Sequence, residues 1–98
     1  MLNSRIIRAP RPAVIAMLMR RMPGELRRQV EEANFDAVGL IQTSLPNLFY
    51  YTDMAQKAGN VIVAEIHGNC PQHVSTVAFF GSNEAVNAAM TAIMAAES

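Results

Sequence analysis

Residues 61–80 read VIVAEIHGNCPQHVSTVAFF, and the interpretation of the whole chain starts from this stretch. Two runs rich in β-branched residues, 61–66 and 74–80, flank a connection that is interrupted by Gly68 and Pro71. Runs of this length and composition predict two β-strands joined as a hairpin. The connection is longer than the two-residue turns that hairpins most often use.

The connection holds the chain's only cysteine, Cys70, and its only two histidines, His67 and His73. One cysteine cannot form a disulfide within the chain. It also cannot supply the four thiolates that iron–sulfur clusters and many structural zinc sites use. If Cys70 binds a metal, copies of it must therefore come from other subunits.

The composition predicts one domain that has partner subunits. The chain has 98 residues, of which 51% are hydrophobic and only 16% are charged. For a small soluble domain this is apolar, so we expect other subunits to cover part of its surface. No segment approaches the roughly 20 apolar residues of a membrane span, and no signal-peptide cleavage site follows the apolar run 13–19. We expect a cytosolic protein without a membrane partner, in which Cys70 is a thiol or a metal ligand.

The basic residues are unevenly distributed. Net charge is zero, yet seven of the eight basic residues are arginines that precede residue 30. A basic segment can indicate nucleic-acid binding. Here the arginines alternate with apolar residues such as Ile6 and Ile7, and they lack aromatic neighbours on which bases could stack. We therefore expect no nucleic-acid partner. A nucleic-acid binder with a basic arm stays open as an alternative, and its binding would weaken steeply with salt.

The chain is expected to alternate between strands and helices. The expected elements are an extended arm at 3–11, a buried strand at 13–19, a helix at 23–33, a strand at 37–43, a helix at 46–58, strands at 61–66 and 74–80, and a helix at 85–96. Pro23 and Pro46 suit the first turns of their helices. Gly59 is expected to end its helix in the left-handed conformation. Ser82 or Asn83 is the expected N-cap of the last helix.

This order predicts an α+β domain with a ferredoxin-like, four-stranded antiparallel sheet and helices on one face. Residues 37–96 give β-α-β-β-α, and the strand at 13–19 completes the sheet. No GxGxxG, P-loop or GxSxG motif occurs, and no carboxylate pair stands beside a histidine at a spacing that indicates catalysis. We expect no enzymatic activity and no catalytic residue. Asp53 and Glu65 are interpreted as solvated or interface charges.

Three stretches carry a resemblance to a known family: VGLI at 38–41, DMAQKAGNV at 53–61 and GSNEAVNAA at 81–89. Through their order and spacing the chain resembles the BMC domain of bacterial microcompartment shell proteins. The resemblance implies a single domain over residues 1–98 that forms a cyclic homohexamer with a central pore, in the shell of a cytoplasmic microcompartment. It also implies that Lys57 lies at the hexamer edge, where it helps to tile hexamers with other shell proteins.

The first third of the chain is similar to the circularly permuted branch of this family, the PduU and EutS type. The matching residues are Arg5-Ile6-Ile7, the run 13–19 and Pro23-Gly24-Glu25-Leu26. The resemblance implies an N-terminal arm at 1–12 and a permuted core at 13–98.

The loop Gly68-Asn69-Cys70-Pro71-Gln72 resembles that of a divergent, GrpU-like branch from glycyl-radical propanediol compartments. In that branch, pore cysteines are associated with an iron–sulfur cluster. The resemblance implies that these five residues bind a cluster of the [4Fe–4S] type, shared between subunits at the pore, with Cys70 as the metal ligand. It further implies electron transfer or cluster delivery across the shell, with encapsulated glycyl-radical pathway enzymes as partners.

The residues alone leave three alternatives open. A lone cysteine is most often a small buried hydrophobic residue. His67, Cys70 and His73 could together ligate zinc or copper, or the histidines could be hydrogen-bonded residues at strand ends. The chain could also be a ferredoxin-like regulatory module that binds a metal or a small ligand and has no role in a shell. A dimer or trimer would then be expected in place of a hexamer.

Overall fold

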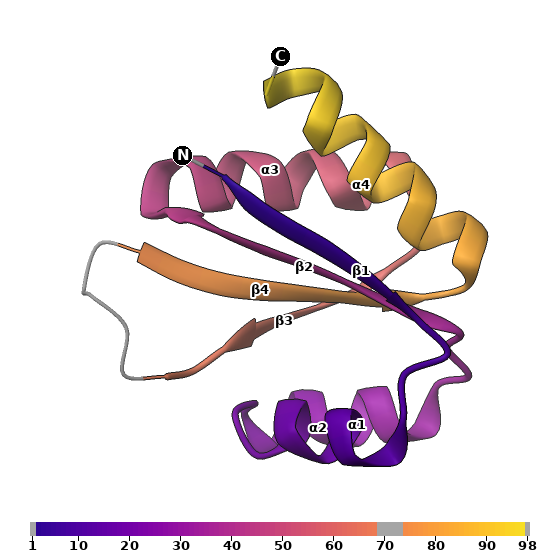
Figure 1. Cartoon of the computed structure of the whole chain (residues 1–98). Helices are drawn as coiled ribbons and strands as arrows, with labels where there is room; N and C mark the ends of the chain where they lie inside the picture. Colours follow the sequence, from indigo (N-terminus) through magenta and orange to yellow (C-terminus); the bar gives the residue numbers. More distant parts are fainter. Residues whose placement is uncertain (1, 69–73, 98) are drawn as a thin grey trace.

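The computed structural model describes residues 2–68 and 74–97, and they form one four-stranded sheet between two helical layers (Figure 1). The elements, in order, are β1 (Asn3–Arg8), α1 (Pro12–Met19), α2 (Gly24–Glu32), β2 (Ala37–Ser44), α3 (Leu45–Ala58), β3 (Ile62–Ile66), β4 (Val74–Gly81) and α4 (Asn83–Glu97). The strand order is β1-β2-β4-β3, and all neighbours are antiparallel. The expected α+β fold with a four-stranded antiparallel sheet is confirmed.

The expected strand at 13–19 is wrong, because α1 occupies Pro12–Met19. Pro12 is well placed in the first helical turn, and the alanines, methionines and leucine that follow are strong helix formers. A short apolar run cannot be assigned to helix or strand by periodicity alone. The strand that completes the sheet is β1, which lies within the stretch expected to be an extended arm. Its register on β2 runs from Asn3 opposite Gln42 to Arg8 opposite Ala37.

Helices cover both faces of the sheet, whereas helices on one face were expected. Figure 1 shows α3 and α4 on one side of the strands and α1 and α2 on the other. The strands alternate accordingly. Towards α3 and α4 they direct Ala37, Ile41, Val77 and Phe79, and towards α1 and α2 they direct Val38, Ala64, Ala78 and Phe80. Each face therefore has its own apolar core.

The link between α2 and β2 is fixed by aromatic packing. Phe35 meets Phe80 of β4 edge to face, with ring centroids 5.2 Å apart and an interplanar angle of 73°. Such a pair contributes about 0.5–1.5 kcal/mol beyond its buried area. The helical layer of α1 and α2 is thus joined to the centre of the sheet.

Two expected helix ends differ in their outcomes. The N–H of Ala85 donates to the Ser82 hydroxyl at 3.1 Å, so Ser82 caps α4 as expected. Gly59 ends α3 as expected, but its backbone is extended (φ −146°, ψ 154°), so the left-handed conformation is wrong. A Cβ at Gly59 would collide with the backbone carbonyl oxygen of Ala85. This position therefore requires glycine because two backbones approach closely.

Candidate functional site: the β3–β4 loop and the two ends of the sheet

The expected functional loop leaves the sheet where β3 and β4 end. The last paired residues are Ile66 and Thr76, and one step before them the Ser75 hydroxyl donates to the Glu65 carboxylate at 2.9 Å. His67 and Gly68 follow β3, and both are exposed. The antiparallel pairing of β3 with β4 confirms the hairpin expected from the sequence.

The base of the loop is tied to the helical layer below it. The backbone N–H of His67 donates to the carbonyl oxygen of Arg21, with a distance of 2.8 Å. Arg21 and Arg20 directly follow α1. The backbone of His67 is thus hydrogen-bonded at the end of β3. The role of its imidazole stays a prediction. No sequence pattern predicts this backbone contact, because it depends on α1 being a helix.

Most of the expected site residues are outside the part of the chain that the structure describes. These are Asn69, Cys70, Pro71, Gln72 and His73. Gly68, the other member of the expected cluster-binding set, is described and exposed. Within residues 2–68 and 74–97, no group of three or more His, Cys, Asp or Glu side chains could hold a metal ion. The expected cluster and the His–Cys–His alternative both stay predictions.

Lys57 lies towards the other end of the subunit. Helix α3 begins directly after Ser44, which pairs with Val74 beside the loop, and its 14 residues lead away from that end for about 20 Å. Lys57 stands in its last turn and forms an ion pair of 2.7 Å with Asp53. Both side chains are largely exposed, at 76% and 63%. The hydrogen bond and the charge of Asp53 raise the pKa of Lys57, so it is a cation at neutral pH.

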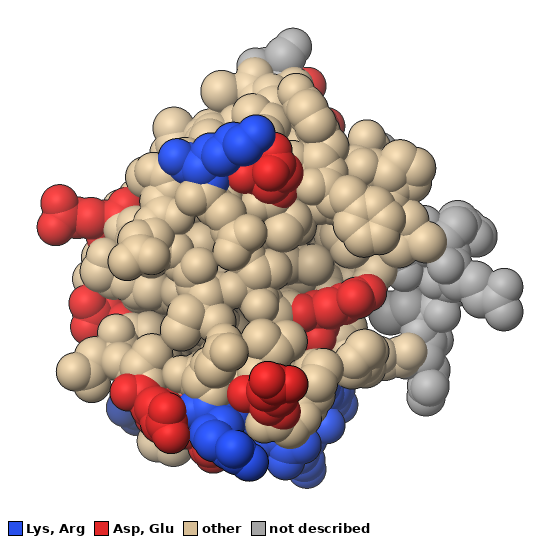
Figure 2. All heavy atoms as spheres, turned by 180° about the vertical axis from the view of Figure 1, so that it is seen from behind, with Lys and Arg blue, Asp and Glu red and all other residues tan. Residues whose placement is uncertain are grey.

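Charged side chains are unevenly distributed on the surface. Figure 2 shows basic side chains gathered over the α1 and α2 layer, together with acidic neighbours, while the middle of this face is mostly uncharged. In the described ranges, Asp53 and Lys57 form the one ion pair within 4.0 Å. The arginines in these ranges therefore have no carboxylate within that distance, and their charges face solvent or a partner.

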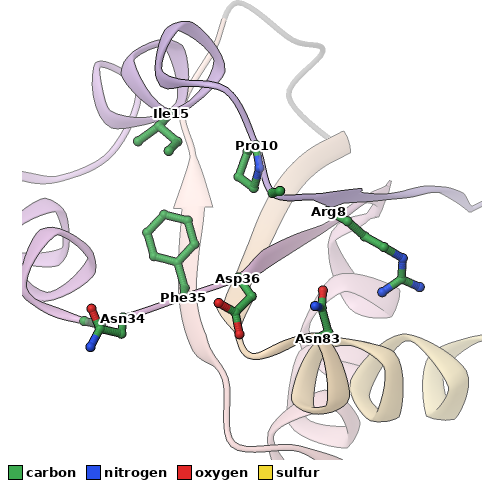
Figure 3. A pocket seen from close by; sticks show the side chains of 9 residues that line it. Arg8, Pro10, Ile15, Asn34, Phe35, Asp36 and Asn83 are labelled. Atoms are coloured by element: carbon green, nitrogen blue, oxygen red, sulfur yellow. The ribbon is translucent and has the colours of Figure 1, made fainter.

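The end of the sheet opposite the loop carries an open cavity of about 530 Å³ that sequence reasoning missed (Figure 3). Phe35 and Ile15 point towards each other on its apolar side, and Asp36 and Asn83 line its polar side. Arg8 points away, and its guanidinium donates to Asn87 of α4 at 2.9 Å. The cavity follows from the turn after β1, which no sequence motif marked.

That turn contains an unusual backbone conformation. Ala9 has φ 48°, in the left-handed region that residues other than glycine seldom adopt. Its N–H donates to the Asp36 carbonyl oxygen at 2.8 Å, and the N–H of Asp36 donates to Gly81 at 2.9 Å. These bonds hold the start of α1, the start of β2 and the end of β4 together.

Comparison with known proteins identifies the family. The BMC domain model matches residues 37–97, which is more than half of the chain. The chain therefore belongs to the BMC domain family. No curated protein sequence matches it.

Among solved structures, the chain is similar to two GrpU microcompartment shell proteins in ligand-free form. The protein from Pectobacterium wasabiae is 43% identical with a TM-score of 0.76, and the match covers 94% of this chain and 99% of that one. The protein from Clostridiales bacterium 1_7_47FAA is 30% identical with a TM-score of 0.71, and the coverages are 97% and 90%. The expected resemblance to the GrpU-like branch is confirmed.

A third solved structure shares the fold alone. It is a fused permuted hexameric shell protein from the RMM microcompartment, 20% identical with a TM-score of 0.70. The match covers 97% of this chain and 44% of that one. Its permuted topology agrees with the expected circularly permuted architecture. The division into an arm at 1–12 and a core at 13–98 stays a prediction.

Family membership gives the coarse function. The chain is a structural shell protein of a bacterial microcompartment in the cytoplasm, and this family supports the expectation that it is not an enzyme. In the described ranges, none of the helices has the length and apolar character needed to cross a membrane.

Proposed function

We propose that six copies of this chain form a closed ring in the shell, and that their β3–β4 loops surround a central pore in which Cys70 thiolates hold an iron–sulfur cluster. The observation that carries this proposal is the polarity of the subunit. Strands β3 and β4, which residues 67–73 connect in the sequence, meet the loop at one end of the sheet, and α3 carries Lys57 towards the other. In a ring, one of these ends faces inwards and the other faces the rim.

The donor chemistry fits such a cluster only in an assembly. Iron–sulfur clusters are commonly held by four thiolates, and each chain has one cysteine. A cyclic hexamer supplies six equivalent Cys70 thiols around its axis. A four-iron cluster uses four of them, so its binding breaks the sixfold symmetry. In an isolated subunit the same residue has no partner thiols.

The surroundings of the loop suit an anionic cluster. Thiolate ligands carry negative charge, and nearby cations favour their deprotonated form. Arg20 and Arg21 follow α1 near the base of the loop, where the Arg21 carbonyl oxygen accepts the His67 N–H. The Arg21 guanidinium donates to the Met17 carbonyl oxygen on α1. Gly68 allows close approach of the backbone, and backbone N–H groups near a cluster tune its potential. A bound cluster would supply one-electron transfer across the shell or serve as cluster cargo for enclosed enzymes.

Lys57 supports the second part of this function, which is contact with other shell proteins. It is the only lysine in the chain, and it is exposed towards the end of the sheet opposite the loop. With the loops at the pore, Lys57 stands at the rim of the ring. There its cation can meet neighbouring rings or other shell proteins.

Anaerobic purification tests the cluster. We expect a hexameric mass, a broad visible absorption, and about four iron and four sulfide per six chains. Cys70→Ser should remove the iron and the colour and keep the hexameric mass. A colourless, iron-free wild-type hexamer after reconstitution with iron and sulfide would refute the cluster and leave the ring intact.

Two matched variants separate cysteine ligation from mixed ligation. His67→Gln and His73→Gln remove the only two imidazoles of the chain. We expect both variants to keep the iron content and spectrum of the wild type. Loss of metal in either variant, or zinc in place of iron, would favour the His–Cys–His alternative.

A further inference from the structure

Two exposed apolar surfaces lie on different elements of the subunit. On α3, the side chains of Phe49 and Tyr50 are 68% and 58% exposed. On β1 and α4, Ile6 and Met94 are 37% and 48% exposed. Large apolar side chains exposed in groups commonly mark interaction sites.

The second surface is hollowed. Ile6, Met90 and Met94 line a cavity of about 320 Å³ together with Ser4 and Arg5. The Ser4 hydroxyl lies 3.6 Å from the Met94 sulfur, which joins β1 to α4 at this point. Methionine side chains adapt to the shape of a partner and make favourable contacts with aromatic rings. An aromatic side chain is therefore a suitable occupant of this cavity.

The two surfaces lie on opposite sides of the subunit. Figure 1 shows β1 and α4 towards the viewer, with α3 behind α4. The sheet order β1-β2-β4-β3 places β1 and β3 at opposite edges. A closed ring repeats one contact between two different patches of the same subunit. Complementary patches on opposite sides are therefore what a ring requires.

The patches also lie at comparable levels along the strands. One row of paired residues crosses the sheet through Ser4, Ile41, Val77 and Glu65. Ser4 of β1, which contacts Met94 of α4, therefore lies at the same level as Glu65 of β3. Phe49 stands in the second turn of α3, which starts at the loop end of the sheet. Rotation about an axis beyond the loop keeps each group at its own distance from that axis. It therefore brings the β1 side of one copy opposite the β3 side of the next at matching levels.

The charges of the two edges are complementary. Edge strand β1 carries exposed Arg5 and Arg8, whose guanidinium groups donate hydrogen bonds to uncharged oxygens of Ser4 and Asn87. Edge strand β3 carries exposed Glu65, which accepts a hydrogen bond from Ser75. A contact between a β1 edge and a β3 edge therefore brings opposite charges together. A contact between two β1 edges or two β3 edges would bring like charges together, which repel each other.

We infer that neighbouring copies meet head to tail, with Phe49 of one copy seated against Ile6 and Met94 of the next. This inference rests on the proposed ring and names its subunit contact. It assigns to α3 a role beyond the edge residue Lys57. The same helix then contacts the neighbouring subunit through its first turns and the neighbouring ring through its last.

Chemical crosslinking tests the contact in a Cys70→Ala background, so that the introduced cysteines are the only thiols. The double variant Phe49→Cys/Met94→Cys, treated with a short bismaleimide, should give a ladder of covalent species up to the hexamer. Each single variant should stay monomeric on denaturing gels. The pair Met17→Cys/Met94→Cys is the matched control, because Met17 on α1 is 50% exposed and lies outside both patches. It should give no ladder.

Native mass measured on the same samples separates the failures. Covalent dimers from either single variant would show a contact between like edges and overturn the inference. A hexameric mass without a ladder in the double variant would overturn the inference and leave the proposed ring standing. A monomeric parent protein would overturn the ring as well.

Discussion

The backbone N–H of His67 donates a 2.8 Å hydrogen bond to the carbonyl oxygen of Arg21. This bond joins the first residue after β3 to the chain just after α1. The position from which the Cys70 loop starts is therefore fixed by a helical layer on the opposite face from α3 and α4.

Loosening α1 should therefore affect the base of the loop. Leu18 is buried on the α1 face of the sheet, and Leu18→Ala should cost about 2–5 kcal/mol. In hydrogen exchange we expect the His67 amide of the wild type to be protected and to lose protection in this variant more than amides in β2 do. Met17→Ala, at an exposed position on the same helix, is the control. Equal protection of His67 in all three proteins would contradict the coupling.

Two glycines should respond differently to an added methyl group. At Gly39 a Cβ would lie 2.7 Å from the Met90 sulfur, and the flexible end of that side chain can shift. Gly39→Ala should cost about 1–3 kcal/mol. At Gly59 the obstacle is the backbone carbonyl of Ala85 at the start of α4, which cannot move independently. Gly59→Ala should therefore reduce the free energy of unfolding more than Gly39→Ala, as measured by denaturant titration. The reverse order would refute this account.

The end of α4 should make stability depend on pH in the alkaline range. The Tyr51 hydroxyl donates to Glu97 at 2.7 Å, and this hydrogen bond, with desolvation and the charges of Glu97 and Tyr50, raises the pKa of Tyr51 above 10. The folded state then holds the phenol proton where the unfolded state loses it. The contribution is complete below pH about 10 and is lost as pH rises through the folded pKa. Glu97→Gln should lower the Tyr51 pKa, as measured by phenolate absorbance. An unchanged titration curve would contradict this.

Lys57 should affect contacts between assemblies and leave the fold unchanged. The side chain is exposed and forms an ion pair with Asp53 of its own helix, so Lys57→Ala should keep the melting temperature and the mass of the basic oligomer. We expect it to lose extended sheets in electron microscopy, because the cation at the rim is missing. Lys57→Arg keeps the charge and should assemble better than the alanine variant. Equal assembly of all three proteins would remove Lys57 from the rim contact.

The sequence predicted the part of the fold from residue 37 onwards well. Its strands alternate or contain β-branched residues, and Pro46, Gly59 and Ser82 mark the helix ends. The hairpin around Cys70 and the exposed position of Lys57 follow directly from these elements.

The first third was more difficult for a physical reason. The run 13–19 is apolar enough for a buried strand, yet Ala13, Ala16 and Met17 are exposed in a helix. The real edge strand, β1, carries arginines because only one of its sides is paired. Burial and pairing depend on tertiary contacts, which composition alone does not reveal.

The elements that carry the candidate site could be predicted from the sequence, but their contacts with distant parts of the chain could not. The helix that carries Lys57 and the start of the loop at His67 lie where the sequence suggested. The Arg21 contact and the cavity beside Asp36 depend on how α1 turns back under the sheet. Local sequence patterns do not predict such contacts, because the contacts join segments that are far apart in the chain.

The covering of both sheet faces has a consequence for solubility. With helices above and below, the sheet keeps unpaired backbone groups only along the outer sides of β1 and β3, which are six and five residues long. Short edges with charged side chains resist the strand-by-strand growth that produces fibrils. Two β1 edges would bring arginines together, and two β3 edges would bring Glu65 carboxylates together. A chain that is half hydrophobic is thereby protected from stacking on itself in the wrong direction.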